Sequence, residues 1–372
     1  TYEALYRDSL RLAKSLASRF QKGEHIVLWS PNNPEWVLIE YAAGLAGLVI
    51  VTANPALQAK ELRYIIEQSD AVGLFLVAKF RGNPMVEIAS RATDGNDKVR
   101  EITDITNHAA LFQNFNNNQL LPIVMPEDAA QIQYTSGTTG FPKGAVLSHL
   151  GLLNNAKFYA DRCKVIQESS WINIMPMFHT SGCGMVTLGC LNSQCRMILV
   201  SFFEPRIVIS LIEKFKAKII LSVPTTALAI LEEQESNPCE VSSLEVLSCG
   251  GANVAPEMVR RVQKSFGCKF STLYGQTEHC PVITQHHLTD SIEDICSTIG
   301  QPINHTDVSI QSVNERDILP VGTIGEICAR GPSTMLCYYG NVEATVQTID
   351  NERWLHTGDL GFMDERGYVT IT

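Results

Sequence analysis

The fold is decided by the stretch HIVLWSPNNPEWVLIEYAAGLAGLVIVT, residues 25–52. Its first five and last five residues are apolar runs typical of buried strands. Between them, Asn33 offers a helix N-cap and Pro34 a first-turn proline, so a helix is predicted from there through about Gly44. Strand, helix and strand in this order indicate a parallel sheet with helices packed on it.

The same alternation continues on both sides of this stretch. Residues 1–20 carry apolar side chains at helical spacing, Asn54-Pro55 repeats the capping device and predicts a second helix, and residues 71–77 predict a third strand. Residues 79–126 are polar and Asn-rich, and we expect a surface excursion there. Strands and helices then alternate again between residues 206 and 273.

Beyond about residue 291 the pattern changes to short β-like runs between Gly and Pro turns, at residues 308–311, 325–329 and 368–371. The predicted fold class is therefore α/β. Two α/β subdomains within about residues 1–290, with mainly parallel sheets flanked by helices, precede a small β-rich, barrel-like subdomain at about 291–372.

The net charge of −10 opposes non-specific binding to nucleic acid or to an anionic membrane. No apolar run reaches the roughly 18–20 residues of a transmembrane segment, and the first residues lack the basic-then-apolar pattern of a secretion signal. The chain opens without methionine, so its true N-terminus is expected to be missing. A cytoplasmic protein is predicted, or a mitochondrial-matrix one if the source is eukaryotic, and not a secreted one.

The 11 cysteines include no Cys-x-x-Cys pair, and many lie in apolar stretches. This favours reduced, partly buried thiols over a disulfide framework or a zinc site. His286-His287 stands on an expected loop, where solvated side chains are the simpler interpretation than a metal site.

The strongest local signal is YTSGTTGFPKG, residues 134–144, placed between two strand-like runs. Hydroxyls and exposed amides in such a turn can surround phosphate oxygens, and a lysine adds positive charge. It is not a Walker P-loop, because Pro142 precedes the lysine and Gly144 follows it. Alone, it could be an ordinary solvated turn. The candidate phosphate-binding residues are Thr135, Ser136, Gly137, Thr138, Thr139, Gly140 and Lys143.

These eleven residues resemble the signature phosphate loop of the adenylate-forming superfamily, which contains acyl-CoA synthetases, luciferases and peptide-synthetase adenylation domains. Four further segments match in order over the whole chain: PMFHTSG (176–182), SCGGA (248–252), YGQTE (274–278) and WLHTGDLG (354–361). The resemblance implies that residues 1–372 form the large adenylate-forming (AMP-binding) domain. The small C-terminal domain, with a catalytic lysine, is expected to lie beyond Thr372.

Adenylation is attack by a carboxylate on the α-phosphorus of ATP, so the site must neutralise charge and align two anions. Glu278 is the acidic residue suited to Mg²⁺, which prefers oxygen ligands. The resemblance implies that Thr135 also lies at the metal and that Thr277 donates to the α-phosphate. In isolation, Glu278 could instead cap a helix and Asp359 a turn.

The remaining roles concern the nucleoside and the acid. Tyr274 offers a flat face for adenine, and Asp359 can accept both ribose hydroxyls. The resemblance implies that His179 borders the acyl pocket, and a packed histidine is the alternative. We assign His179 no acid–base role. Further nucleotide-binding candidates are Gly250, Gly251, Ala252 and Gly275.

The TSGTTG form of the loop and Asn154-Asn155 resemble medium- or long-chain fatty acyl-CoA synthetases most. No aspartate near residues 180–184 is present to hold a substrate amine, and the apolar, helix-like stretch 183–190 could line an acyl tunnel. The expected substrates are a carboxylic, fatty acid, ATP with Mg²⁺, and CoA. The sequence indicates neither the length of the acyl chain nor the oligomeric state. A non-catalytic ATP- or acyl-binding module, acyl transfer to a carrier protein and a luciferase-like oxidase stay open.

Overall fold

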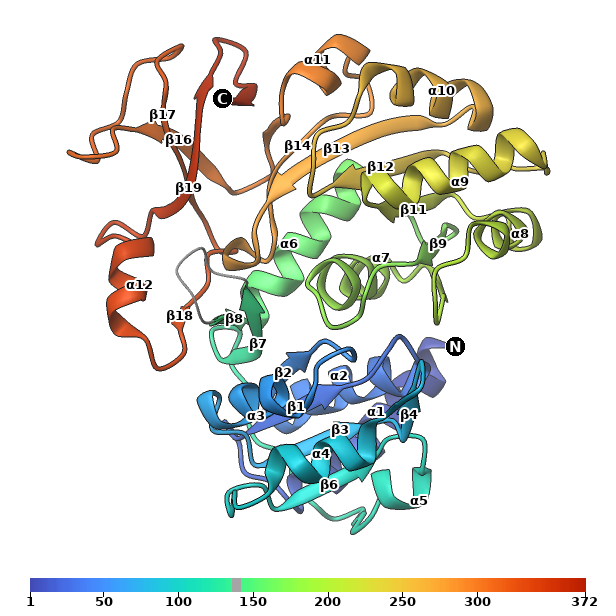
Figure 1. Ribbon diagram of the computed structural model, residues 1–372, viewed down its shortest axis with the longest axis vertical. Helices are drawn as coiled ribbons and strands as arrows, with labels where there is room; N and C mark the ends of the chain where they lie inside the picture. The colour runs from blue at the N-terminus through green and yellow to red at the C-terminus, as the bar shows by residue number, and fades with distance from the viewer. Residues whose placement is uncertain (136–141) are drawn as a thin grey trace. The chain divides into compact units, whose positions relative to one another are not determined.

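The structure is a computed structural model that describes residues 1–135 and 142–372 (Figure 1). The chain divides into two compact units. Unit 1 comprises Thr1–Leu150, Pro176–Cys183 and Met335–Val342. Unit 2 comprises Gly151–Met175, Gly184–Thr334 and Glu343–Thr372.

Unit 1 is built on a seven-stranded sheet, which begins with the predicted strand–helix–strand stretch. The strands β1 (His25–Trp29) and β2 (Val49–Ala53) pair in parallel, and nearly all of their residues are buried. Buried strands of this kind need helices on both faces. The order across the sheet is β18 (Cys337–Tyr338), β8 (Lys143–Ser148), β7 (Ala129–Thr135), β2, β1, β3 (Gly73–Leu76) and β6 (Glu101–Asp104).

The helices of unit 1 begin and end where local signals place them, with one exception. The side chain of Asn33 accepts a hydrogen bond from the Trp36 amide at 2.8 Å, and α2 ends at Gly47 with φ of 69°. The predicted second helix is present as α3, but its predicted start at Asn54-Pro55 is wrong, because the Asn54 side chain accepts from the Ala56 amide and closes a turn before the helix begins at Ala59. The helices are α1 (Tyr2–Ala17), α2 (Pro34–Ala46), α3 (Ala59–Gln68), α4 (Met85–Thr93) and α5 (His108–Leu111).

The stretch 79–126 is more ordered than the expected surface excursion. It contains the hairpin β4 (Lys79–Phe80) and β5 (Asn83–Pro84), helix α4 and strand β6. Strand β6 extends the parallel sheet next to β3. The polar composition concealed this, because β6 is an edge strand with only Thr103 buried.

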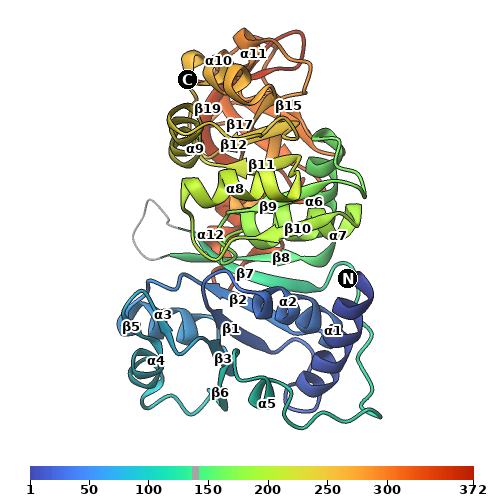
Figure 2. The same cartoon turned by 90° about the vertical axis from the view of Figure 1, so that its right-hand side faces the viewer.

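Unit 2 has a second seven-stranded sheet, in which β10, β9, β11, β12 and β13 are parallel. Strands β14 and β15 continue it in antiparallel fashion. Figure 2 shows α8, α9 and α10 alongside this sheet, where they pack on β9, β12 and β13. The strands are β9 (Ser170–Asn173), β10 (Arg196–Leu199), β11 (Ile219–Ser222), β12 (Val246–Gly250), β13 (Lys269–Gly275), β14 (Val282–Gln285) and β15 (Gln301–Pro302).

The helices that cover this sheet follow the predicted alternation. Three of them start with a proline in the first turn, as the sequence indicates. The stretch predicted as a plain helix near residues 183–190 is a π-helix, Ser181–Leu188, continued by α7. The helices from residue 149 onward are α6 (His149–Arg162), α7 (Gly189–Ser193), α8 (Pro205–Phe215), α9 (Pro224–Ser236), α10 (Pro256–Phe266), α11 (Ile292–Ser297) and α12 (Val342–Thr348).

A four-stranded antiparallel sheet in unit 2 confirms the predicted β-rich part. Its order is β16 (Asp307–Gln311), β17 (Gly325–Arg330), β19 (Leu355–Met363) and β20 (Val369–Ile371). Ile310, Ile327 and Val369 form its small core. The fold class, two α/β sheets with helices and one curled antiparallel sheet, is therefore confirmed.

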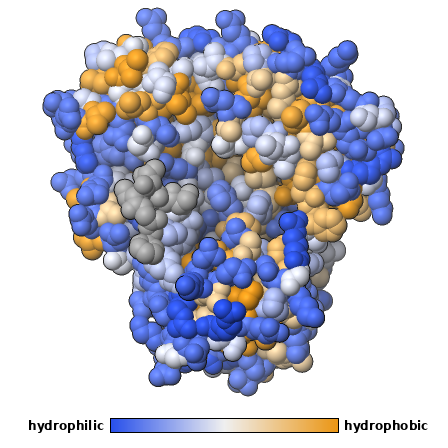
Figure 3. Space-filling view, in the orientation of Figure 1, coloured by the Kyte–Doolittle hydropathy of each residue, from blue (hydrophilic) through white to orange (hydrophobic). Residues whose placement is uncertain are grey.

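The surface shown in Figure 3 is covered mainly by hydrophilic residues, with apolar side chains scattered among them. Among the helices that the structure describes, none combines the length and the apolarity that a membrane span requires.

Candidate functional site

The strands on either side of the predicted phosphate loop form a hairpin. Strand β7 ends at Thr135 and pairs antiparallel with β8, which begins at Lys143, so these two residues face each other. The Thr135 hydroxyl lies 3.5 Å from the Lys143 carbonyl oxygen, and the Lys143 ammonium group lies 4.5 Å from the ring centroid of Tyr338. The predicted phosphate ligands Ser136, Gly137, Thr138, Thr139 and Gly140 lie outside the described residues.

A chain of buried, hydrogen-bonded polar side chains connects β7 to α2. Gln133 donates to Gln131 at 2.7 Å, and Gln131 donates to Glu40 of α2 at 2.8 Å. Burial raises the pKa of the Glu40 carboxyl well above its usual range. The hydrogen bonds from Gln133 to Gln131 and from Gln131 to Glu40 thus anchor the strand that leads into the loop.

His179, the predicted acyl-pocket residue, belongs to unit 1 and lies just before the π-helix, which begins at Ser181. Its Nδ1 accepts a hydrogen bond from the Ser181 amide at 3.2 Å and lies 3.0 Å from the Ser181 hydroxyl. The ring is accessible to solvent, although the protein atoms around it lower its pKa through desolvation. A neutral, oriented imidazole can line a pocket without taking part in proton transfer.

Unit 2 contains a pocket of about 280 Å³ at the carboxyl ends of β12 and β13. In parallel α/β sheets, this edge is where ligands bind. The pocket brings together five of the residues predicted to bind the nucleotide: Gly251, Ala252, Tyr274, Gly275 and Asp359. Pockets that enclose a whole drug-sized ligand span about 300–1,000 Å³. The pocket here lies just below that range, which suits a nucleoside.

Two of these five residues interact directly. The Tyr274 hydroxyl donates to Asp359 Oδ2 at 2.7 Å, which joins the end of β13 to β19. Gly275 is required by close packing, because a Cβ atom there would lie 1.9 Å from the Pro281 carbonyl oxygen. The backbone at Gly275 therefore approaches Pro281 more closely than any side chain allows.

Thr277 and Glu278 lie just beyond β13, in a single 3₁₀ turn, Thr277–His279, and both are buried. They do not line the pocket of about 280 Å³, and neither does Gly250, the last residue of β12. The next residue, His279, is fully buried, and this burial lowers its pKa to about 3. The 3₁₀ turn thus presents a carboxylate beside a neutral imidazole.

Sequence reasoning missed most of the other pocket residues. Their apolar or small side chains carry no chemical signal, and their position is defined only when α11 and β20 approach β13. They are Asn253, Val254, Thr272, Leu273, Ile295, Cys296, Thr298, Ile299 and Ile371.

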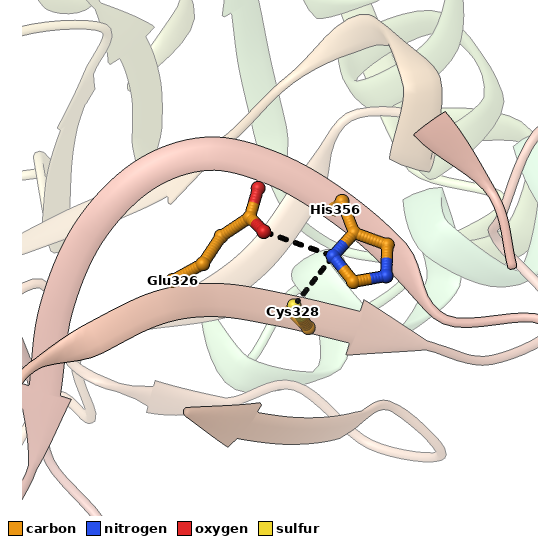
Figure 4. A group of neighbouring side chains, drawn as sticks. All are labelled: Glu326, Cys328 and His356. Atoms are coloured by element: carbon orange, nitrogen blue, oxygen red, sulfur yellow. Dashed lines mark hydrogen bonds and ion pairs between the residues drawn. The ribbon is translucent and has the colours of Figure 1, made fainter. Parts of the chain in front are cut away.

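A second missed group lies beside Asp359, in the antiparallel sheet (Figure 4). Glu326 and Cys328 of β17 both point toward His356 of β19. His356 Nδ1 lies 2.9 Å from Glu326 Oε2 and 3.4 Å from Cys328 Sγ. No sequence signal links these residues, which lie about thirty positions apart and meet only through the strand pairing.

One histidine expectation is wrong. His286 is buried rather than solvated, because it directly follows β14 and its ring is enclosed between β13 and the α11 region. Its Nδ1 lies 2.6 Å from the Thr272 hydroxyl and its Nε2 lies 2.8 Å from the Thr298 hydroxyl. The 11 cysteines, all within the described residues, form no disulfide.

A parallel α/β sheet with a nucleoside-sized pocket at its carboxyl edge, lined by an aromatic residue and a carboxylate, is an arrangement typical of nucleotide-binding enzymes. The chain belongs to the family of AMP-binding enzymes, whose pattern it matches over residues 1–339. It is 32% identical to a putative acyl-CoA synthetase, YngI, of Bacillus subtilis, over 94% of this chain and 69% of that protein. It is 28% identical to the mitochondrial medium-chain acyl-CoA ligase ACSF2 of Bos taurus, over 100% of this chain and 66% of that protein.

Solved structures agree with this family assignment. The N-terminal domain of FACL13 from Mycobacterium tuberculosis superimposes with a TM-score of 0.91 at 23% identity, over 100% of this chain and 92% of that one. A long-chain-fatty-acid-CoA ligase, FadD1, of Archaeoglobus fulgidus gives a TM-score of 0.89 at 25% identity, over 100% and 77%. The ATP-bound MatB of Rhodopseudomonas palustris gives 0.87 at 25%, over 100% and 72%. This chain spans about two thirds of the length of the relatives YngI and ACSF2.

Proposed function

We propose that the protein uses Mg-ATP to convert a carboxylic acid, of the fatty acid type, into an acyl-adenylate, which it then transfers to CoA. The observation that carries the proposal is the pocket at the carboxyl ends of β12 and β13, where Tyr274 and Asp359 are hydrogen-bonded to each other. An aromatic face and an acceptor carboxylate are the groups that a nucleoside requires. Family membership supports the reaction class.

In this proposal, Asp359 accepts the ribose hydroxyls and the ring of Tyr274 contacts adenine, with Gly251, Ala252 and Gly275 around the base. Thr277 donates to the α-phosphate. Mg²⁺ prefers oxygen ligands, and the Glu278 carboxylate would supply one, while the place of Thr135 at the metal stays a prediction from the sequence. Bound there, the ion would neutralise charge on the phosphates.

Two further residues act on the acid and on the phosphates. His179 borders the acyl group, and Lys143 adds positive charge beside the phosphate loop. The relatives' names support a fatty acid, since they include medium-chain and long-chain ligases. The arrangement of residues 1–372 as one large adenylate-forming domain and the cytoplasmic or mitochondrial-matrix location both stay predictions from the sequence.

The test uses the protein that carries this chain, and the 372-residue chain beside it. Acid-dependent exchange of pyrophosphate into ATP is expected with one or more saturated fatty acids of graded length. Thioester formation with CoA, and none with a carrier protein, is expected next. Nucleotide binding without exchange for any acid would favour a non-catalytic binding module instead. Thioester on a carrier protein alone would correct the acceptor but leave the adenylation step intact.

The chain alone is expected to bind ATP and to turn over slowly, because the resemblance places a catalytic lysine outside it. One preorganised charged donor contributes about 3–4 kcal/mol to such a transition state. Exchange by the 372-residue chain at the rate of the whole protein would contradict this expectation.

A further inference from the structure

We propose that Glu326 is a positioning residue for nucleotide binding, which holds the turn that carries Asp359 by joining the backbone of that turn to His356. The inference deepens the proposed function and rests on the ribose role of Asp359. It concerns residues of unit 2 alone.

The argument begins with the register of the antiparallel sheet. Glu326 of β17 pairs with Leu360 of β19, and Cys328 pairs with His356. Two steps along β17 therefore correspond to four steps along β19, from 360 to 356. The two additional residues make a bulge at Thr357–Asp359, and such bulges re-aim side chains beside active sites. Gly358, at φ of 79°, supplies the left-handed backbone that the bulge requires.

A bulge removes regular ladder hydrogen bonds, and here side chains replace them. Glu326 Oε1 accepts from the Gly358 amide at 2.9 Å. The Thr357 hydroxyl donates to the Ile327 carbonyl oxygen at 2.7 Å and accepts from the Asp359 amide at 3.1 Å. The amides of Gly358 and Asp359 and the carbonyl oxygen of Ile327 thus have side-chain partners.

His356 fixes the other end of the Glu326 carboxylate. Its Nδ1 lies 2.9 Å from Glu326 Oε2, and its Nε2 lies 3.4 Å from Asp350 Oδ2. The His356 and Glu326 side chains are 5% and 14% exposed, so water competes little for these bonds. Glu326 is therefore held from two sides, by a ring and by an amide, directly next to Asp359.

A metal ion is the rival interpretation, because ligand atoms of Glu326, Cys328 and His356 lie within 4.8 Å of one another. The hydrogen bonds oppose it, because Glu326 Oε1 accepts from the Gly358 amide and Oε2 lies 2.9 Å from His356 Nδ1.

The experiment compares the dissociation constants of ATP and of 2′,3′-dideoxy-ATP, which lacks both ribose hydroxyls. In the wild-type protein the dideoxy compound should bind about tenfold more weakly or worse, since a hydrogen bond to a charged group is lost. In E326Q this ratio should fall to less than half of the wild-type ratio, because the amide group of Gln cannot accept from both Gly358 and His356. H356Q should lower the ratio too, and it serves if E326Q does not fold.

C328A is the matched control. It removes a fully buried group from the same cluster and should lower the melting temperature, while the ratio of the two dissociation constants stays that of the wild type. A general loss of stability does not change this ratio, so the ratio separates positioning from a merely structural role.

The outcomes distinguish the proposed ribose site from the positioning role of Glu326. A wild-type ratio near one, or no nucleotide binding, would remove the proposed ribose site and this inference with it. A clear wild-type ratio that E326Q and H356Q leave unchanged would overturn the inference alone. So would stoichiometric zinc in the purified protein that C328A abolishes. D359A removes every polar atom of the side chain, so it should bring the ratio to about one and marks the limit of the effect.

Discussion

Tyr274 and Asp359 are 85 positions apart in the chain, and the Tyr274 hydroxyl donates to Asp359 Oδ2 at 2.7 Å. This bond joins the last parallel strand of one sheet, β13, to a bulge in another, β19. Burial and the Asp359 carboxylate raise the pKa of Tyr274 far above its usual range, so the phenol keeps its proton and donates at all physiological pH values.

Y274F tests this bond. The ring that would contact adenine remains, and only the donor to Asp359 is lost, which is expected to cost about 0.5–1.5 kcal/mol, or a two- to tenfold weaker affinity for ATP. Isothermal titration calorimetry measures it. Y6F removes an exposed hydroxyl on α1 and should bind ATP as the wild type does. Equal affinities for Y274F and the wild type would count against the assigned pocket.

G275A tests the close approach at the pocket floor. A Cβ atom at this position would lie 1.9 Å from Pro281 O and 2.9 Å from the Ile283 amide nitrogen. The backbone must move, and such overpacking costs about 1–3 kcal/mol in the free energy of unfolding. Denaturant titration measures this loss.

G44A is a control for which the free energy of unfolding should rise rather than fall. Gly44 lies inside α2, where a new Cβ atom meets only His149 Cε1 at 3.5 Å, an ordinary contact. Alanine should therefore stabilise the helix by about 0.5–1 kcal/mol. If both substitutions destabilise equally, the proposed steric conflict at Gly275 is not the cause.

E278Q tests the proposed magnesium site. The amide keeps the size of the side chain but removes its charge, so ATP affinity in the presence of Mg²⁺ should fall about tenfold. With excess EDTA, the variant and the wild type should bind ATP alike. E257Q, on the exposed start of α10, is the control for a lost negative charge. An equal loss for E278Q with and without Mg²⁺ would argue for a structural role.

H286N tests the pH dependence of stability. Desolvation lowers the pKa of His286 in the folded state, although Asp290 and Asp294 partly oppose this. The unfolded chain, with a pKa near 6.5, therefore takes up the proton first. Stability is complete above that pH and falls as the pH drops below it, by at most about 1.4 kcal/mol per pH unit for one proton.

The measurement is the free energy of unfolding between pH 7.5 and 5. His149, His179 and His279 have pKa values lowered in the same direction, so the wild-type decline is a sum. H286N should reduce the slope without abolishing it. A slope identical to that of the wild type would mean that His286 titrates alike in both states.

Short sequence patterns predicted the helices and strands whose formation depends on residues close together in the chain. Strand β1 has the predicted bounds, and the helix predicted from Asn33-Pro34 begins at Pro34. The same device misled at Asn54, because the Asn side chain can close a turn as well as cap a helix, and only packing decides between them. Strand β6 was missed because a half-exposed edge strand lacks an apolar pattern.

For the candidate site too, some features follow from the local sequence and others only from the tertiary structure. The sequence by itself determined the family, because phosphate, adenine and ribose each require particular side chains in contiguous segments, such as YGQTE and TGD. Tertiary structure alone decided that His286 is buried, that Gly275 admits no side chain, and that Glu326 and His356 meet beside Asp359. The physical reason is that burial and register are properties of pairs of distant segments. A two-residue bulge in β19, which no local pattern indicates, determines which side chains meet there.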